Sequence, residues 1–255
     1  MKHYKGYLID LDGTMYRGEE KIEAASRFVQ KLIEKELPYL FVTNNSSRTP
    51  KQVADKLVSM GIPTTEGHVF TTSMATAQYI DETHGKANTF MIGENGLEEA
   101  LINQGLKVTD KDVDVVVMGI DRNITYEKLS IACLAIRNGA RFLSTNGDVA
   151  IPTERGLLPG NGSLTSVVRV STGVEPTFIG KPESIIVDQA LEVLGVPLDD
   201  TVMVGDNYQT DIMAGINANM DTLLVHTGVT SKEQLAIEKK KPTWSIDSLD
   251  DWTVL

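Results

Sequence analysis

The 255-residue sequence predicts an α/β fold, a doubly wound (Rossmann-like) parallel sheet with a second α/β domain inserted into it. Short apolar runs rich in β-branched and aromatic residues alternate with segments of helical period, the pattern of parallel strands joined by helical crossovers. Several of these runs end in a polar or charged residue. One interval between two runs is much too long for a single crossover, which indicates the insertion.

The elements follow one another along the chain in this alternation. Strands are expected in the apolar runs at residues 4–9, 37–43, 114–120, 141–145, 176–180, 200–205 and 221–227. Helices are expected in the amphipathic segments at residues 24–36, 50–60, 73–83, 96–104, 126–138, 163–172, 183–194 and 210–219. Thr49 followed by Pro50 is typical of a helix start, because threonine caps the first turn and proline suits the first helical position. Gly61 and Gly195 are typical of helix ends.

The long middle interval predicts the second domain. It follows the strand at 37–43 and contains two strand candidates of its own, at 114–120 and 141–145, with several helices. We therefore expect a discontinuous core at residues 1–76 and 178–255 and an inserted domain at residues 77–177.

Composition and charge narrow the class of protein. With 41% hydrophobic and 23% charged residues the chain suits an ordinary globular protein, and no apolar run reaches the ~18 residues of a membrane span. The formal net charge of −11 argues against a nucleic-acid partner, because binding to a phosphate backbone needs clustered lysine and arginine. The first residues lack the apolar core of a signal peptide, and the single cysteine, Cys133, lies in an apolar run. We expect a cytoplasmic protein with Cys133 as a small core residue.

Polar residues at the ends of four expected strands indicate one shared site. In doubly wound sheets, ligands bind at the carboxyl ends of the strands. The residues found there are Asp10 and Asp12 after 4–9, Thr43 and Asn44 at the end of 37–43, Lys181 after 176–180, and Asp206, Asn207 and Asp211 after 200–205. Acids at this density need a cation, and hard oxygen ligands suit Mg²⁺ with a substrate phosphate. The four histidines have no zinc-type spacing.

The two acids of the first strand end can divide the chemistry between them. Asp10 and Asp12 point to the same side because the side chains of a strand alternate with a period of two. One carboxylate, kept ionised by Mg²⁺ and Lys181, can act as a nucleophile on phosphorus. The other can carry a proton to the leaving group and then activate water.

Competing interpretations of these residues have less support. A calcium loop needs glycine at its sixth position, whereas Gly13 is the fourth residue counted from Asp10. A P-loop at 173–182 would have its glycines too far apart, and no G-x-G-x-x-G follows a strand. A receiver module, which also joins acids, a threonine and a lysine around Mg²⁺, is the best non-enzymatic rival. It has about half this length and no inserted domain.

Taken together, four motifs resemble those of the haloacid dehalogenase (HAD) superfamily of hydrolases, specifically its NagD-like, class IIA branch with a C2-type cap domain. They are DLDGT at 10–14, TNN at 43–45, GKP at 180–182 and GDNYQTD at 205–211. The resemblance covers nearly the whole chain, and the motifs occur in the family's order and spacing.

The resemblance implies a Mg²⁺-dependent phosphoric monoester hydrolase. Asp10 would form an aspartyl-phosphate, and Asp12 would be the general acid and base. Thr43, Asn44 and Lys181 would bind the phosphoryl group. The metal ligands would be Asp10, Asp12 (through its backbone carbonyl) and Asp206, with Asn207 and Asp211 supporting the metal and its waters. Residues 15–18 would begin a flap over the site.

The cap would select the leaving group. GIDRNITYEKL at 119–129 and STNGD at 144–148 are similar to cap stretches of the same branch, and they make Asp121, Arg122, Asn146 and Asp148 candidate specificity residues. The alternative is that these are turn residues and a surface ion pair.

The expected partner is a small phosphorylated metabolite, such as a sugar phosphate or a nucleoside monophosphate, with p-nitrophenyl phosphate as a generic substrate. Caps of this branch often mediate homodimers. A phosphomutase or phosphotransferase of the same fold, or a non-catalytic protein that binds a phosphometabolite, remains an alternative.

Overall fold

The computed structural model of the protein describes residues 2–153 and 155–254, and the chain forms two compact units. Unit 1 consists of Met1–Thr43, Lys51–Phe70 and Lys181–Leu255, and unit 2 of Asn44–Pro50 and Thr71–Gly180. Each unit contains its own parallel sheet. Unit 2 therefore starts before, and ends after, the inserted domain expected at 77–177, and it also includes the short segment 44–50.

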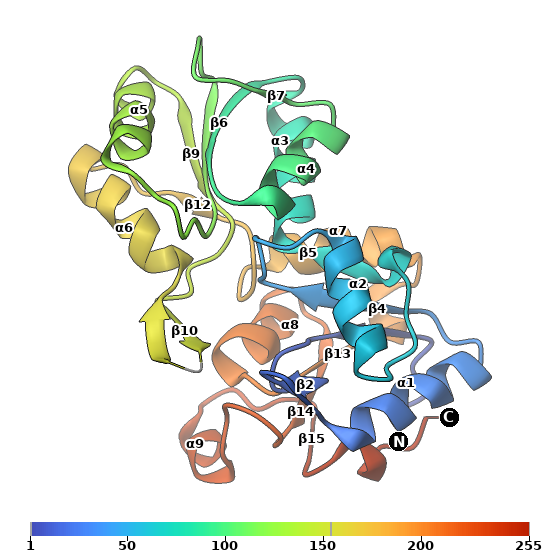
Figure 1. Ribbon diagram of the computed structural model, residues 1–255. Coiled ribbons are helices and arrows are strands. Elements are labelled where there is room, and N and C mark those ends of the chain that lie inside the picture. The colour runs from blue at the N-terminus through green and yellow to red at the C-terminus, as the bar shows by residue number, and fades with distance from the viewer. Residues whose placement is uncertain (1, 154, 255) are drawn as a thin grey trace. The chain divides into compact units, whose positions relative to one another are not determined.

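The sheet of unit 1 has six strands in the order β15-β14-β13-β1-β4-β5. Their bounds are β1 Gly6–Ile9, β4 Tyr39–Thr43, β5 Val69–Thr71, β13 Thr201–Gly205, β14 Asp221–Val225 and β15 Trp244–Ile246. β1 pairs in parallel with β4 on one side and with β13 on the other, and Figure 1 shows β13, β14 and β15 side by side. The strand order reverses at β1, so the topological switch point of a doubly wound sheet lies where Asp10 follows this strand. The predicted fold class is confirmed.

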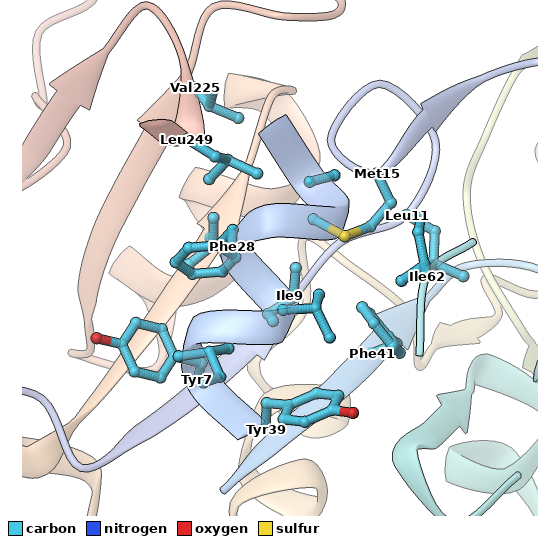
Figure 2. Close-up of a cluster of buried hydrophobic side chains, with 14 of the residues drawn as sticks. Tyr7, Ile9, Leu11, Met15, Phe28, Tyr39, Phe41, Ile62, Val225 and Leu249 are labelled. Atoms are coloured by element: carbon cyan, nitrogen blue, oxygen red, sulfur yellow. The ribbon is translucent and has the colours of Figure 1, made fainter. Parts of the chain in front are cut away.

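Helices and apolar side chains bury both faces of this sheet. On one face, Ile9 and Phe41 belong to a cluster that includes the apolar residues of α1 (Glu23–Glu34) and α2 (Pro50–Ser59). Leu11 and Met15, just after β1, join the same cluster (Figure 2). On the opposite face, Leu224 packs with residues of the turn η3 (Tyr208–Ile212), which continues into α8 (Met213–Asn217). The strands that carry the site residues are therefore held by packing on both faces of the sheet.

The sheet of unit 2 has five parallel strands in the order β12-β9-β8-β6-β7. Their bounds are β6 Asn88–Ile92, β7 Lys107–Val108, β8 Val115–Met118, β9 Arg141–Ser144 and β12 Thr177–Phe178. Figure 1 shows α3 (Thr72–His84) and α4 (Asn95–Asn103) on one side of these strands, with α5 (Tyr126–Arg137) and α6 (Asn161–Thr172) on the other. Cys133 is buried in the cluster between α5, α6 and the sheet, so its predicted place in the core is confirmed.

Short elements complete the described chain. They are β2 (Tyr16–Arg17) paired antiparallel with β3 (Glu20–Lys21), β10 (Ala150–Thr153) paired antiparallel with β11 (Gly156–Pro159), the helices α7 (Ser184–Leu194) and α9 (Lys232–Ile237), and the short helical turns η1 (Glu66–His68), η2 (Leu198–Asp200) and η4 (Leu249–Asp251). Among the described helices, none combines the length and apolar character needed to span a bilayer.

One strand assignment from the sequence is wrong. The run 176–180 was expected to stand in the core sheet, but β12 pairs with β9 in the sheet of unit 2. Periodicity identifies a strand without identifying its sheet, and this run lies at the point where the chain passes from unit 2 to unit 1. Lys181 belongs to unit 1 even though the strand before it does not.

Candidate active site

A buried lysine of unit 1 is bonded to two carboxylates at once. The Lys181 Nζ donates to Asp10 Oδ1 at 2.5 Å, to Asp211 Oδ1 at 2.7 Å and to the carbonyl oxygen of Val42 at 3.0 Å. Lys181 is 2% exposed and is the one lysine or arginine among the buried residues of the described chain. Ion pairs this far from water depend on complete pairing, because either partner alone would be a buried, uncompensated charge.

Asp206, at the end of β13, completes the group of acids. Its Oδ1 accepts a hydrogen bond from the Thr14 hydroxyl at 3.1 Å, and its Oδ2 accepts one from the backbone N–H of Val229 at 2.7 Å. Gly13 has a φ of 96°, and a Cβ built at Gly13 or at Gly228 would overlap the Asp206 carboxylate. Two glycines therefore let the backbone approach this carboxylate closely, one of them in a conformation that favours glycine.

The side chains present fit a metal ion. One carboxylate oxygen from each of Asp10, Asp206 and Asp211 lies within 4.8 Å of the others, and all three residues are buried. Oxygen ligands from carboxylates suit hard divalent cations. The family resemblance implied a supporting role for Asp211, and the structure puts its carboxylate in the same group as those of Asp10 and Asp206. The Asp12 carboxylate is outside this group, and its expected metal contact was through the backbone carbonyl.

The charges of the group are unbalanced without a cation. Burial and the neighbouring Asp211 raise the pKa of Asp10 well above its ordinary value, and burial with Asp211 raises the pKa of Asp206 from 3.8 to about 6. Burial alone would lower the pKa of Lys181, but the carboxylates of Asp10 and Asp211 raise it above its ordinary range. Lys181 therefore stays charged while the acids retain excess negative charge, which a divalent cation would neutralise.

A divalent cation should stabilise the protein in a pH-dependent way. The raised pKa of Asp206 means that, without metal, the folded state binds this proton more tightly than the unfolded chain does. The contribution of this group to stability is therefore greatest at low pH and falls as pH rises from 3.8 to about 6. Because a cation competes with that proton, we expect it to raise the melting temperature more at pH 7.5 than at pH 5. Melting curves with Mg²⁺ and with a chelator test this, and an equal rise at both pH values would contradict it.

Asp12 occupies a different environment from Asp10. Asp12 is exposed. It forms a β-bridge with Tyr16, the first residue of β2, and the neighbouring Gly13 N–H donates to the Tyr16 carbonyl at 2.7 Å. Desolvation raises the pKa of Asp12, while the nearby backbone of Gly18 and the charge of Lys56 oppose that rise. The two carboxylates of the DLD motif therefore differ in burial and in partners, as two different chemical roles require.

The other core residues that the sequence singled out also follow strands. Thr43 is buried at the end of β4 in unit 1, whereas Asn44 already belongs to unit 2. The side chain of Asn207 accepts a hydrogen bond from the Gln209 N–H, and the Asn207 N–H donates to Asp211 Oδ2 at 3.0 Å. Asn207 thus helps to hold Asp211 in place.

The four candidate cap residues fall into two pairs. The Asp121 carboxylate accepts from Lys128 Nζ at 2.6 Å and from the Asn123 N–H at 2.8 Å, both beside the start of α5. Arg122 pairs with Glu94 at 2.8 Å. These contacts are made within unit 2. They favour the interpretation of Asp121 as a turn residue and of Arg122 as one partner of a surface ion pair.

Asn146 and Asp148 are instead joined to the second motif. The Asn146 side-chain amide donates to the Asn44 carbonyl at 2.8 Å, and the Asn44 side-chain amide donates to Asp148 Oδ1 at 3.3 Å. The structure therefore brings two of the four cap candidates together with Asn44, and does not bring Asp121 and Arg122 into that group.

The loop 226–230, which follows β14, is a part of the site that sequence reasoning missed. Its Val229 N–H contacts Asp206, and the Thr227 hydroxyl donates to the Gly13 carbonyl at 2.7 Å. The sequence had a signal for it, since His226, Thr227 and Gly228 follow an apolar run as the other site residues do. This signal is weak because residues 226–230 include no acid or lysine.

We expect Gly228→Ala to weaken metal binding. The added methyl group would force the Asp206 carboxylate or the loop 226–230 to move. Misplacing one ligand of an oxygen site should lower metal affinity about 10-fold or more. Calorimetric titration with Mg²⁺ measures this. Gly67→Ala is the matched control, because a Cβ at Gly67 would meet only the Thr65 hydroxyl at 3.7 Å. Unchanged affinity in Gly228→Ala would show that the close approach is not needed.

This fold and this group of acids define a class of hydrolase, and comparisons with known proteins identify it. A family model for haloacid dehalogenase-like hydrolases matches residues 7–107, and a second model, HAD-hydrolase-like, matches residues 178–252. The chain belongs to the haloacid dehalogenase-like hydrolase family, and the resemblance seen in its four motifs is confirmed at that level.

Particular relatives are phosphatases. The chain is 68% identical over 252 residues, covering 99% of it and 98% of the relative, to a protein of Bacillus subtilis (strain 168) named 5′-nucleotidase YutF. It is 53% identical over 251 residues, with 98% and 97% covered, to an acid sugar phosphatase of Staphylococcus epidermidis. A crystal structure of a mutant thermostable NPPase from Geobacillus stearothermophilus superposes with a TM-score of 0.95 at 58% identity and full coverage of both chains.

Proposed function

We propose that the protein is a Mg²⁺-dependent phosphomonoesterase that hydrolyses a small phosphorylated metabolite through an aspartyl-phosphate. The observation that carries the proposal is the pairing of Lys181 Nζ with Asp10 at 2.5 Å, next to two further buried acids, Asp206 directly after β13 and Asp211 in the turn η3 that follows. Phosphoryl transfer to an aspartate requires a nucleophilic carboxylate and a second carboxylate that can move a proton. Asp10, beside the buried ammonium group of Lys181, suits the first role, and Asp12, in a different environment, suits the second.

In the proposed first step, an oxygen of Asp10 attacks phosphorus and the ester bond to the leaving group breaks. Asp12 donates a proton to the departing oxygen, which leaves as an alcohol. In the second step, Asp12 takes a proton from water, the water oxygen attacks the aspartyl-phosphate, and Asp10 is released with inorganic phosphate. Lys181, Thr43 and Asn44 would bind the phosphoryl oxygens and offset their charge.

Asp10, Asp206 and Asp211 would hold the Mg²⁺, with Asn207 orienting Asp211. The ion would supply charge neutralisation for the phosphoryl group and for the acids around it. Proposing Mg²⁺ over other divalent cations rests on the all-oxygen ligand set and on a phosphate substrate, both of which suit it.

The class of substrate is proposed from the relatives and tested directly. Because one relative is named a 5′-nucleotidase and another an acid sugar phosphatase, we propose that nucleoside 5′-monophosphates and sugar phosphates include the physiological substrate. Asn146 and Asp148, which contact Asn44, are the proposed specificity residues among the four cap candidates.

A panel of these phosphates and p-nitrophenyl phosphate, scored by release of inorganic phosphate, tests the function. We expect Mg²⁺-dependent release that a chelator abolishes. Transfer of the phosphoryl group within one sugar phosphate, without release, would favour a mutase. Binding of Mg²⁺ and phosphate without turnover on any member would favour a non-catalytic binding protein.

A further inference from the structure

Lys56 lies on α2 and is joined to the short hairpin of β2 and β3, residues 16–21. Its Nζ donates to the Gly18 carbonyl at 2.9 Å and lies 4.2 Å from the centre of the Tyr16 ring. A third contact, to Glu19 Oε1 at 3.5 Å, is longer. The Lys56 side chain is only 17% exposed, so its charge is partly withdrawn from water and is held by these partners.

The same hairpin holds Asp12. Gly18, with a φ of 60°, lies at the tip of the hairpin and accepts from Lys56 with its carbonyl oxygen. At the base of the hairpin, the Tyr16 carbonyl accepts from the Gly13 N–H, and Asp12 forms a β-bridge with Tyr16. Lys56 therefore contacts Tyr16, whose backbone is bonded to the DLD turn, and it also anchors Gly18 at the tip of the same hairpin.

The hairpin needs such support. It pairs only two residues with two, and an isolated two-stranded hairpin is marginal in water. Tyr16 is buried, but Arg17, Gly18, Glu19 and Glu20 are all exposed. The exposed side chains of the hairpin do not fix the Gly18 peptide by packing. The Arg17 side chain donates to the Thr227 carbonyl, and at Gly18 itself the partly buried ammonium group of Lys56, on a packed helix, supplies the anchor.

We propose that Lys56 is a positioning residue for Asp12. It holds the hairpin through the Gly18 carbonyl and the Tyr16 ring, so that the Tyr16 backbone, which is bonded to the DLD turn, keeps the Asp12 carboxyl in place for proton transfer to the leaving group. The inference rests on the proposed function, because it assigns Asp12 the proton transfer of that reaction. It adds a residue that the four motifs do not contain.

Leaving groups of different basicity reveal this role. p-Nitrophenolate departs as a stable anion and needs little help from an acid, whereas phenolate from phenyl phosphate needs the proton. A misplaced acid should therefore slow hydrolysis of phenyl phosphate more than that of p-nitrophenyl phosphate. The two substrates have nearly the same shape, so a general loss of folding or of phosphate binding lowers both rates alike.

The test compares Lys56→Met with the wild-type protein on both substrates. We expect kcat for phenyl phosphate to fall about 10-fold or more and kcat for p-nitrophenyl phosphate by no more than about 3-fold, within the span of general acid catalysis. KM should change little for either. Lys56→Arg, which keeps the charge, the donors and the ring contact, should restore most of the loss. The control is Lys51→Met on the same helix, because Lys51 is 69% exposed and pairs only with Asp55 among the contacts described for it.

A second readout needs no turnover. Hydrogen exchange at the amide of Gly13, which donates to the Tyr16 carbonyl, should be faster in Lys56→Met than in the wild type and in Lys51→Met. Equal losses on the two phosphate esters, or unchanged exchange at Gly13, would overturn the role of Lys56. Failure of the proposed function looks different, because the wild-type protein itself would then release no phosphate from either ester.

Discussion

Asp10→Asn should abolish phosphate release while leaving the protein folded. We expect kcat to fall at least about 10⁴-fold, the scale on which loss of a covalent nucleophile acts in other hydrolases. Asparagine has the same shape, and its carbonyl oxygen can still accept from Lys181, but the neutral amide is a very poor nucleophile. The change also removes one buried charge, whose burial first and the neighbouring Asp211 second raise the pKa of Asp10. Melting temperature without metal should therefore hold steady or rise.

Three measurements on Asp10→Asn separate chemistry from folding: phosphate release, the melting curve, and acid-quenched labelling with a ³²P-phosphate ester. The wild-type protein should retain label, and the variant should not. Asp188→Asn, the same substitution at an exposed acid of α7, is the control and should behave as the wild type. Undiminished turnover in Asp10→Asn would remove the nucleophile from the mechanism, and loss of the folded state would show that Asp10 is needed first for stability.

Much of this site could be predicted because parallel strands place their carboxyl ends at one edge of a sheet. Asp10, Thr43 and Asp206 follow or end β1, β4 and β13, which are neighbours in unit 1. Asp10 and Asp206 each follow an apolar run directly, and such a pattern can be recognised in a sequence without any knowledge of contacts. The doubly wound architecture follows from the same alternation, since helical crossovers leave parallel strands few other arrangements.

The remainder depends on contacts between residues far apart in sequence. Lys181 was expected at a strand end of the core, but its preceding strand β12 lies in the other sheet, and only the side chain's reach to Asp10 shows where it acts. Backbone donors such as the Val229 N–H leave no mark in a sequence, because every residue except proline has one. Lys56 was missed for a related reason: a lysine on an amphipathic helix usually faces solvent, and this one turns toward a hairpin 38 positions earlier.

Lys181→Met should cost both stability and activity, and a second substitution can separate the two. The change removes the ammonium group from between Asp10 and Asp211 and leaves two buried carboxylates facing each other. Breaking a buried ion pair in this way typically costs about 3–5 kcal/mol in the free energy of unfolding. Activity should fall about 10²–10³-fold or more, the scale for losing one charged group that stabilises a transition state. Urea unfolding without metal and phosphate release with Mg²⁺ measure the two losses.

The double variant Lys181→Met/Asp211→Asn decides what the lysine does. Removing one of the facing charges should recover much of the lost stability, because the remaining acid can be protonated or hydrogen-bonded without a charged neighbour at that position. Its activity must be compared with that of Asp211→Asn alone, since Asp211 is itself a proposed metal ligand. If Lys181 binds the phosphoryl group, the double variant stays far less active than Asp211→Asn although it is well folded, and KM for the phosphate ester rises as well. If the lysine only relieves repulsion between acids, the double variant and Asp211→Asn turn over equally fast. The buried pair of Lys181 with Asp10 would then be a structural support for the nucleophile and would have no part in binding its substrate.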